Sequence, residues 1–480
     1  MLFNSIQFLI FFPIVTMLFF LLPHRFRWLL LLIASCFFYM TLIPIYILIL
    51  FLTITVDYLA GIMIEDAKDK KQKLLFLVIS IISTLGILFV FKYFDFFSVN
   101  FNAIASFLHW NYSIGALKLL LPIGLSFHTF QSMSYVIEVY WGKQKAERNY
   151  GMYSLYVMFY PQLVAGPIER PQNLLHQFYE KHYFEYKRVT EGLKMMLLGL
   201  FKKIVIADNL TIVVNTIYNN PTEYTGIPLI LGTIFFAFQI YCDFSGYSEI
   251  AIGAAHVMGF KLMTNFRRPY YSRSIGEFWK RWHISLSTWF KDYVYIPLGG
   301  SRVSTLRIYF NLFVVFLISG IWHGANWTYV IWGALHGIYR IISLVTEKIR
   351  NKFTEKIGLV RHPGLHALLK ISITFILVNI GWIFFRANNL EDAMYILTHL
   401  FTGLTLNFSG IMIGTNWTGL LIIFISILIM EIFHLIQEHR SMRDFIASKP
   451  VMIRWSVYIF LIWLIILWGA KGADFIYFQF

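Results

Sequence analysis

The sequence predicts an all-α, polytopic integral membrane protein with about 11 transmembrane helices plus re-entrant or interfacial helices. Charged residues make up 14% of the 480 residues, whereas soluble domains carry about 25%. The mean hydropathy is +0.64. Long stretches contain no Asp, Glu, Lys or Arg: residues 1–24, 28–56, 74–91, 119–137, 224–242 and 308–339. Because a bilayer core needs roughly 20 apolar residues per helix, several of these stretches are long enough to span it.

The expected spanning segments follow the apolar runs from the N-terminus to the C-terminus. They are residues 6–22, 28–40, 43–64, 74–91, 119–139, 151–166, 226–243, 308–340, 367–385, 417–436 and 455–470. Pro44 divides the second long run, since proline interrupts a helix. Helices are expected because continuous apolar runs lack the alternation of a membrane barrel. With no polar linker and no internal repeat, residues 1–480 are expected to form a single membrane domain.

Basic residues outnumber acidic ones by 40 to 25, a net charge of +15. They gather in short loops between apolar runs, as at Arg25 and Arg27 and within residues 68–73. Such loops are typical of the cytoplasmic face, where they meet anionic membrane lipids, so nucleic acid is not an expected partner. No basic residue precedes the first apolar run, which predicts an N-terminus outside and no cleaved signal peptide. The only two cysteines, Cys36 and Cys242, form no metal or disulfide motif.

Two regions do not fit simple spanning helices. Residues 192–220 are apolar but interrupted by Lys202, Lys203 and Asp208, and residues 261–302 mix aromatic with basic side chains. One interpretation is an amphipathic helix lying at the membrane interface. The other is a re-entrant segment lining a cavity, where irregular backbone at membrane depth is tolerated. The sequence favours neither.

The strongest candidate for chemistry is His323, in the motif SGIWHGANWTYVIWGALHG at residues 319–337. It lies in the charge-free run 308–339, where an ionisable side chain is costly and tends to be functional. A histidine hydrogen-bonded to a neighbouring helix and a catalytic base are both consistent with this placement. Gly320, Gly324 and Gly333 are poor helix formers, and they allow backbone or ligand to approach closely.

The neighbours of His323 favour the catalytic alternative. Trp322, Asn326 and Trp327 are expected to bring N–H donors beside the imidazole. In a continuous helix Asn326 would share a face with His323, so a base and a donor for a developing oxyanion would lie together. His336 would lie about 220° further round that helix, which excludes a metal shared by the two histidines. No metal site is expected elsewhere.

A second histidine, His283, lies in FWKRWHISLSTWFKDYVYIPLGG, with Ser287 one helical turn further on. Aromatic and basic side chains at a membrane interface would give the same pattern. Asp243 and Ser245 lie in QIYCDFSGYS, a polar stretch beside an apolar run. An intramembrane carboxylate such as Asp243 or Asp57 would be an ion-coupling candidate in a transporter.

These motifs resemble those of the membrane-bound O-acyltransferase (MBOAT) family, in the bacterial branch that O-acetylates alginate and peptidoglycan. The resemblance runs through nearly the whole chain. It is carried by LPIGLSFHTFQSMSYVIEVYWG (121–142), YPQLVAGPIERP (160–171), GLFKKIVIADNL (199–210), FQIYCDFSGYSEIAIG (238–253), FRRPYYSRSIGEFWKRWHISLSTWFKDYVYIPLGG (266–300), SGIWHGANWTYVIWGALHG (319–337), GWIFFRA (381–387) and FIYFQF (475–480).

The resemblance implies a many-helix domain around a central tunnel, with the catalytic region at about residues 238–340. His323 matches the catalytic histidine of the family. His283 matches the second one, often Asn or Asp in other branches. The residues expected to line the tunnel or contact substrate are Asn326, Trp322, Trp327, Trp282, Asp243 and Ser245.

The resemblance also implies the partners. No bound cofactor is expected; an acyl thioester, acetyl-CoA or an acyl carrier, is the co-substrate on the cytosolic side. The acceptor polysaccharide lies outside, where a partner resembling an SGNH-type esterase is expected to place the acetyl group. The location implied is the bacterial cytoplasmic (inner) membrane.

O-acetyl transfer with His323 as general base is therefore the first hypothesis. D-alanyl transfer to teichoic acid through a carrier protein is the alternative inside the family. A transporter or channel for acyl groups is the alternative from another class, and it predicts that Asp243, not His323, is the sensitive residue.

Overall fold

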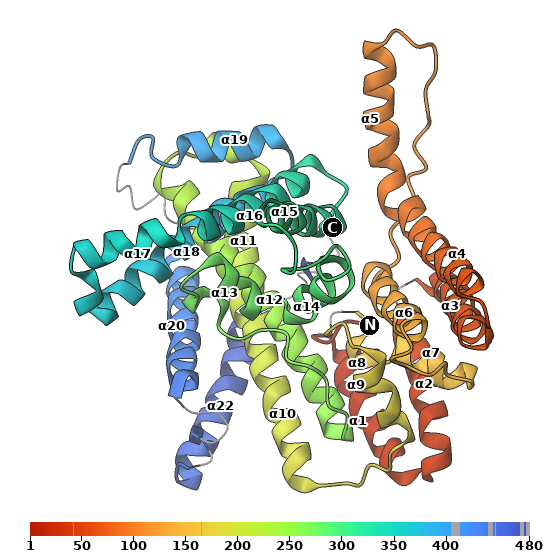
Figure 1. Ribbon diagram of the computed structural model, residues 1–480. Helices are drawn as coiled ribbons and strands as arrows, with labels where there is room; N and C mark the ends of the chain where they lie inside the picture. The colour runs from red at the N-terminus through yellow and green to blue at the C-terminus, as the bar shows by residue number, and fades with distance from the viewer. Residues whose placement is uncertain are drawn as a thin grey trace. The chain divides into compact units, whose positions relative to one another are not determined.

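The computed structural model describes residues 1–41, 43–164, 166–404, 413–439, 445–446, 448–470 and 475–476. Every regular element in these ranges is helical, which confirms the all-α prediction (Figure 1). The chain forms two compact units, the first of Met1–Met196 and Ser248–Met263, the second of Leu197–Tyr247 and Thr264–Phe480. The boundary falls within two helices, α10 (Tyr186–Leu200) and α12 (Ile227–Met258).

The first unit begins with four long apolar helices, and local sequence sets where its helices start. Its helices are α1 (Ile6–Leu21), α2 (His24–Met40), α3 (Ile47–Asp66), α4 (Lys70–Leu88), α5 (Phe94–Phe107), α6 (Leu125–Tyr140), α7 (Tyr150–Met158), α8 (Tyr160–Leu163) and α9 (Pro171–Leu174). The side chains of Ser5 and Asn149 cap α1 and α7 by accepting hydrogen bonds from free backbone N–H groups. A π-helical turn at Phe89–Tyr93 joins α4 to α5.

A buried carboxyl group ties together three helices of this unit. Asp57 of α3 accepts hydrogen bonds from Ser80 (2.5 Å) and Thr84 (3.1 Å) of α4 and from Ser132 of α6. All four residues are almost completely inaccessible to solvent. Since a buried polar group without partners is expensive, these hydroxyl groups account for the tolerance of Asp57 inside an apolar segment.

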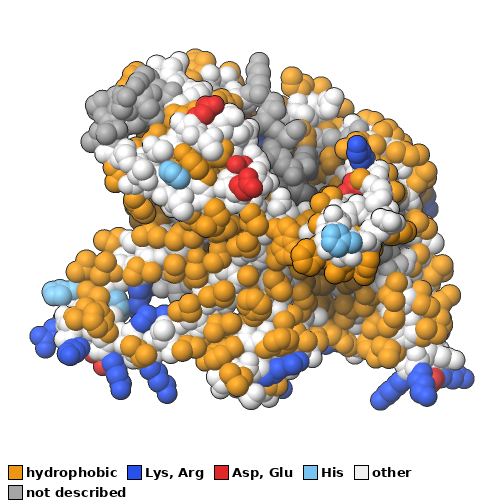
Figure 2. All heavy atoms as spheres, turned by 90° about the horizontal axis from the view of Figure 1, so that it is seen from above, with side chains coloured by type: hydrophobic (Ala, Val, Ile, Leu, Met, Phe, Trp, Pro, Cys, Tyr) orange, Lys and Arg blue, Asp and Glu red, His pale blue; other side chains and the backbone are white. Residues whose placement is uncertain are grey.

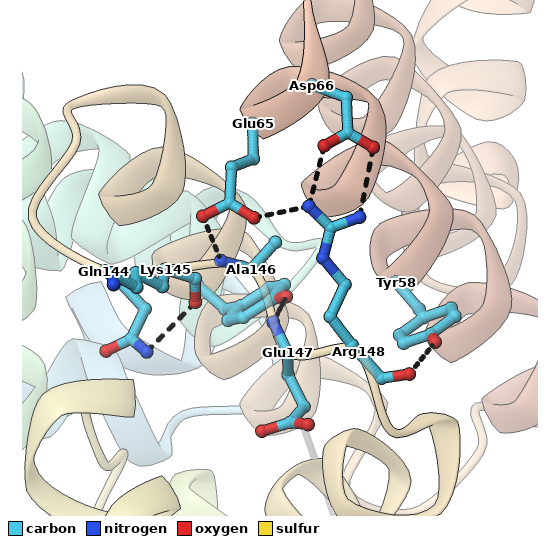
Figure 3. A network of polar contacts seen from close by, with 9 residues as sticks. Tyr58, Glu65, Asp66, Gln144, Lys145, Ala146, Glu147 and Arg148 are labelled. Atoms are coloured by element: carbon cyan, nitrogen blue, oxygen red, sulfur yellow. Dashed lines mark hydrogen bonds and ion pairs between the residues drawn. The ribbon is translucent and has the colours of Figure 1, made fainter.

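A second polar network lies at the C-terminal end of α3. The guanidinium of Arg148 contacts Asp66 at 2.6 Å and Glu65 at 2.7 Å, while the backbone carbonyl of Arg148 accepts from Tyr58 (Figure 3). Glu65 also accepts from the backbone N–H of Ala146. The network therefore holds the loop before α7 against the end of α3, which is followed closely by the Lys-rich first turn of α4.

The second unit carries the segments that resemble catalytic motifs. Its elements include the π-helical η4 (Phe201–Ala207), α11 (Asp208–Asn219), α13 (Ile275–Arg281), α14 (Ile284–Phe290), the π-helical η7 (Lys291–Tyr295), α15 (Thr305–His323), α16 (Trp327–Val345), α17 (Glu347–Lys356), α18 (Pro363–Arg386), α19 (Leu390–His399), α20 (Trp417–His439) and α22 (Val451–Trp468). In Figure 1, α15 and α16 lie side by side.

Eight helices among the described residues are long and apolar enough to cross a membrane. They are Pro44–Asp66, Lys70–Phe107, Ile227–Met258, Thr305–His323, Trp327–Val345, Pro363–Arg386, Trp417–Gln437 and Val451–Trp468. Ile6–Leu21 is a shorter apolar helix of 16 residues. The structure thus has a multi-pass membrane architecture, while the predicted number of 11 spans stays a prediction.

Several predicted segments differ from the helices found. The segment 308–340, predicted as one span, is two helices separated by residues 324–326. Residues 119–124 are not helical, and α6 starts only after Gly124, whose φ of 79° is in the left-handed region. The segment 151–166 is interrupted at Phe159, because the following Tyr160–Pro161 step starts a new turn. In each case a Gly, Pro or capping Asn inside an apolar run marks the point where a helix starts or ends.

The two irregular regions are inserted into the packed interior. Lys202, Lys203 and Asp208, at the junction of α10, η4 and α11, are at most 4% exposed. In the region 261–302, short helices follow Arg268 and His283, both of which have positive φ angles. His283 and Trp282 are buried at 0% and 1% exposure. This burial favours a re-entrant segment over a helix lying flat at the interface.

The surface agrees with a protein that lies in lipid. Figure 2 shows surfaces dominated by hydrophobic side chains. Only 11% of the apolar window of α22 is buried within the protein, and Met452 and Ile466 are 84% and 72% exposed. Exposed apolar surface of this extent is costly in water and favourable against lipid tails.

Candidate active site

Helices α15 and α16 meet through two glycines of the predicted catalytic motif. A Cβ on Gly320 would lie 2.3 Å from the backbone oxygen of Tyr329 and 3.0 Å from the Cα of Gly333. A Cβ on Gly333 would lie 2.5 Å from the backbone oxygen of Phe316. Small residues allow this close approach of membrane helices, so these glycines serve helix packing.

His323 is the last residue of α15 and is only 4% exposed. Three aromatic rings enclose its imidazole: Trp322 at 4.9 Å, Trp332 at 5.0 Å and Phe385 at 5.2 Å between ring centroids. Each ring is steeply inclined to the imidazole, a preferred geometry for aromatic pairs. The side chain is therefore held in one orientation at a helix end, in surroundings that are largely apolar.

The expectation that Asn326 shares a helical face with His323 is wrong, because α15 ends at His323. Asn326 instead caps α16: its carboxamide oxygen accepts from the backbone N–H of Thr328 at 3.0 Å. Its NH₂ group donates to the backbone oxygen of Asn388 at 3.1 Å. Trp327 is 49% exposed at the first turn of α16. Among the three predicted donors, the ring of Trp322 contacts His323 at 4.9 Å between centroids.

His283 is fixed by a hydrogen bond to Asn265. His283 is the residue directly before α14 and has a φ of 43°. Its side chain is completely buried, at 0% exposure. Its Nδ1 lies 3.1 Å from Oδ1 of Asn265, an oxygen that also accepts from the hydroxyl of Ser285 at 2.9 Å. Because a carboxamide oxygen is only an acceptor, Nδ1 carries the proton and Nε2 the lone pair. Burial lowers the pKa of His283 to about 3, so the ring is neutral near pH 7.

The indole of Trp322 connects the two histidines. Its centroid lies 6.4 Å from that of His283 and 4.9 Å from that of His323. Trp282, a predicted tunnel residue, packs 5.0 Å from Trp382 in the same aromatic cluster. Ser287, predicted one turn beyond His283, donates instead to the backbone oxygen of Trp282 at 3.2 Å. The structure thus brings His283, Trp322 and His323 into one continuous set of ring contacts.

Sequence reasoning missed four aromatic residues and one histidine of this cluster. Trp332 lies between His323 and His336, about equally far from both at 5.0 Å, and stacks on Trp382 at 6.1 Å. Trp279 donates from its indole N–H to Nδ1 of His336 at 3.3 Å. Phe385 and Trp382 belong to the GWIFFRA stretch, whose aromatic density was the available signal. His336 was placed on the far side of a single helix, and the break at residues 324–326 removes that argument.

Asp243 and Ser245 are both buried in α12. Oδ1 of Asp243 lies 2.8 Å from Nζ of Lys203, and its Oδ2 accepts from the backbone N–H of Ile476 at 2.7 Å. Lys203 also contacts Asp208 at 2.7 Å. Both carboxylate oxygens of Asp243 are therefore engaged by the protein, which does not favour the ion-coupling role of the transport hypothesis.

A cavity of about 660 Å³ lies between the α13–α14 segment and one face of α15 and α16. Its walls include Trp279, Phe316 and Ser319, and three basic side chains also line it: Lys280, Lys291 and Arg340. Ser319 is one helical turn before His323, and Trp279 packs 5.6 Å from Trp332. The cavity therefore runs from basic side chains to within one helical turn of His323.

Comparison with known proteins places these features in a family. A model of the membrane-bound O-acyltransferase (MBOAT) family matches residues 149–385. The chain is 41% identical to "Probable alginate O-acetylase AlgI" of Pseudomonas putida, over 82% of this chain and 79% of the relative. It is 37% identical to a peptidoglycan O-acetyltransferase of Helicobacter pylori, over 76% of this chain and 72% of the relative. A teichoic acid D-alanyltransferase of Streptococcus thermophilus is 30% identical over 56% of this chain and 69% of the relative.

Proposed function

This chain belongs to the membrane-bound O-acyltransferase family, and from that premise we propose that it acetylates hydroxyl groups of a cell-surface or extracellular polysaccharide with His323 as the general base. As a multi-pass membrane O-acetyltransferase, it shares its reaction class with relatives named for alginate and peptidoglycan. An alginate-type or peptidoglycan-type polymer is the acceptor that these relatives suggest.

The observation that carries the proposal is the enclosure of His323 by aromatic rings at the end of α15. The neutral imidazole takes the proton of the acceptor O–H group as its oxygen attacks the thioester carbonyl carbon. The tetrahedral intermediate then collapses: the C–S bond breaks, the ester C–O bond remains, and the imidazolium returns the proton to the departing thiolate. An apolar enclosure limits competing attack by water.

His283 serves as the second histidine of the site. Its pKa of about 3 keeps it uncharged near pH 7, because burial disfavours the protonated ring. The hydrogen bond to Asn265 directs the proton to Nδ1, which leaves Nε2 as the acceptor atom. Through Trp322 this ring is linked to His323, so His283 supports the indole that packs against the proposed base.

The thioester donor, acetyl-CoA or an acyl carrier, would enter from the cavity beside α15. Its basic residues Lys280, Lys291 and Arg340 suit the phosphate groups that both donors carry. Ser319, which lines this cavity, is one turn from His323, which suits delivery of the thioester carbonyl to the base. No bound cofactor is part of this mechanism.

The proposed setting is the bacterial cytoplasmic membrane with the N-terminus outside. In the first unit His24 contacts the Tyr179 backbone, Tyr179 contacts Glu147, and the adjacent Arg148 pairs with Asp66. These contacts bring the basic first turn of α2 and the end of α3, which precedes the basic first turn of α4, to one end of the first unit, as expected for a cytoplasmic face. The polysaccharide lies on the other side of the membrane, where a protein related to SGNH-type esterases is the expected partner.

Two alternatives have weaker support. D-alanyl transfer is suggested by relatives that match 56% of this chain at 30% and 26% identity, less than the acetyl-transferring relatives match. The transporter hypothesis depends on Asp243 as an ion-coupling residue. One carboxylate oxygen of Asp243 pairs with Lys203, and the other accepts from the backbone N–H of Ile476. The transporter alternative makes no use of the enclosure of His323, whereas D-alanyl transfer would use the same histidine and differs in the acyl donor.

The test uses purified protein in proteoliposomes supplied with labelled acetyl-CoA, or an acetyl-loaded carrier protein, on one side and a polysaccharide acceptor on the other. Wild type should consume the thioester and form an ester, and His323→Ala should lose at least about 100-fold in rate. The matched control is His362→Ala, an exposed histidine that should keep wild-type activity. Unchanged ester formation by His323→Ala, or acetyl flux without ester, would contradict the proposal.

A further inference from the structure

Three charged side chains meet in the interior of the second unit. Lys203 of η4 lies between Asp208 of α11 and Asp243 of α12, with Nζ–Oδ1 distances of 2.7 and 2.8 Å. All three residues are at most 2% exposed. Burial raises the pKa of Asp208 to about 7, although the ion pair with Lys203 opposes this shift.

The backbones of α12 and η4 lie close together at this cluster. Gly246, one turn after Asp243, faces the π-helical turn that carries Lys203: a Cβ there would lie 2.7 Å from the oxygen of Gly199 and 3.1 Å from the nitrogen of Lys203. A larger residue would separate α12 from η4 and lengthen the Lys203–Asp243 contact. The motifs GLFKKIVIADNL and QIYCDFSGYS thus meet at this ion pair.

The other oxygen of Asp243 binds a distant part of the chain. Oδ2 accepts from the backbone N–H of Ile476 at 2.7 Å. Phe475 and Ile476 are buried at 0% and 2% exposure, and the Phe475 ring lies 4.3 Å from Tyr247 and 5.9 Å from Phe244.

The side chain of Phe244 connects the Asp243–Ile476 contact to the candidate active site. Phe244, the residue after Asp243, packs edge-on against His283 with the ring centroids 4.6 Å apart and at an angle of 90°. Phe475 therefore packs against Phe244, and Phe244 packs against His283. A buried ion pair is weak evidence for added stability, and its best attested use is to fix one arrangement among several.

We propose that the Lys203–Asp243 ion pair is a clamp for the C-terminal segment at Phe475–Ile476, and that the clamped segment holds Phe244 and His283 in their active geometry. The inference rests on the proposed acyl-transfer function for its effect on turnover. Asp243 and Lys203 are then positioning residues, which contact neither substrate nor His323. Removal of the clamp should lower turnover without removing the base.

The first test removes the backbone hydrogen bond from Ile476 to Asp243 and keeps the ion pair. Ile476→Pro removes the N–H donor and leaves the Lys203–Asp243 pair intact, whereas Ile476→Ala keeps the donor. Acetyl transfer by Ile476→Pro should fall about 10-fold to 100-fold below that of Ile476→Ala, because a small misplacement at the site is costly. The decrease should appear in kcat, with KM for the donor unchanged. Size-exclusion profiles and helix content should match those of wild type.

A second measurement does not depend on acyl transfer. Ile476→Cys is made in a full-length chain that carries Cys36→Ser and Cys242→Ala, and its thiol is titrated with N-ethylmaleimide in proteoliposomes. The thiol should react slowly while Asp243 is present, and at least about 10-fold faster after Asp243→Asn breaks the ion pair. Ser448→Cys, an exposed position, is the control and should react equally in both backgrounds.

The outcomes distinguish this inference from the proposed function. Equal activity of Ile476→Pro and Ile476→Ala, or rapid labelling at position 476 with Asp243 present, would overturn the clamp while acetyl transfer by wild type stands. Absence of acetyl transfer in wild type, with the labelling difference retained, would overturn the proposed function and the effect on turnover, and leave the clamp itself supported.

Discussion

Nδ1 of His283 and Oδ1 of Asn265 lie 3.1 Å apart, so one carboxamide decides which nitrogen of a buried imidazole carries the proton. The same oxygen accepts from Ser285, which holds the carboxamide in that orientation. The chemistry available to His283 therefore depends on a residue outside the histidine motif.

Asn265→Leu should lower acetyl-transfer turnover about 10-fold to 100-fold, because the proton on Nδ1 loses its acceptor and the ring loses its orientation. The hydroxyl of Ser285 loses a partner too, so the free energy of unfolding should fall by about 1–3 kcal/mol. Steady-state kinetics and thermal unfolding in detergent measure the two effects. Asn351→Ala on the exposed face of α17 should change neither. An Asn265→Leu enzyme with wild-type turnover would show that His283 needs no orienting partner.

Stability should fall on acidification because of His283. Its pKa is about 3 in the folded protein and about 6.5 when unfolded, so the unfolded state binds more protons between these values. The contribution is fully present above about pH 6.5 and is lost as the pH falls toward 3, with a slope of at most about 1.4 kcal/mol per pH unit. Unfolding midpoints between pH 7.5 and 4.5 should thus decline less steeply for His283→Gln than for wild type. Parallel curves would contradict the buried, neutral ring.

Gly333→Ala should destabilise the α15–α16 contact by about 1–3 kcal/mol, since the added methyl group meets the backbone oxygen of Phe316 at 2.5 Å. Activity should fall in parallel, because the displaced end of α15 carries His323. The matched control is Gly86→Ala in α4, where nothing lies within 4 Å of the new Cβ. That change should be neutral or stabilise by up to about 1 kcal/mol through helix propensity. Equal thermal stability of the two variants would show that the helices do not need the close approach.

Arg340→Ala should raise KM for the thioester donor about 10-fold while kcat changes little, because a charge-assisted hydrogen bond to a donor phosphate is lost in the ground state and the transition state alike. The effect should weaken at high ionic strength. Arg307→Ala, an exposed basic residue of α15 that does not line the cavity, is the control. A fall in kcat at constant KM would place the donor elsewhere.

Composition made the fold class predictable, and local sequence did not set every helix end. Continuous charge-free runs marked the spans because an unpaired charge in lipid is costly, and most predicted segments lie on helices. The break between His323 and Trp327 was missed because Gly324 and Asn326 interrupt a run that stays apolar by composition. Hydropathy registers the transfer of side chains to lipid and does not register a capping carboxamide.

The residues of the candidate site also divide into those that the sequence indicated and those that it did not. His323 and His283 stood out because they occur in long motifs, and Trp322 and Trp282 because they are their neighbours in sequence. Asn265, Trp332 and Phe385 were missed, since each makes its contact between separate helices or loops, Trp332 across the break at residues 324–326. Of the C-terminal motif predicted at residues 475–480, Phe475 and Ile476 are described, and residues 477–480 lie outside the described residues.

The sequence by itself determined that this protein is helical, lies in a membrane and carries two histidines in acyltransferase-like motifs. Tertiary structure decided what Asp243 does: its charge is compensated by Lys203 and its second oxygen binds the backbone of Ile476. It also decided that Asn326 caps a helix and that Trp322 lies between the histidines. The physical reason is that transfer to lipid depends on each residue separately, whereas pairing of a buried charge depends on which distant groups the fold brings within hydrogen-bond distance.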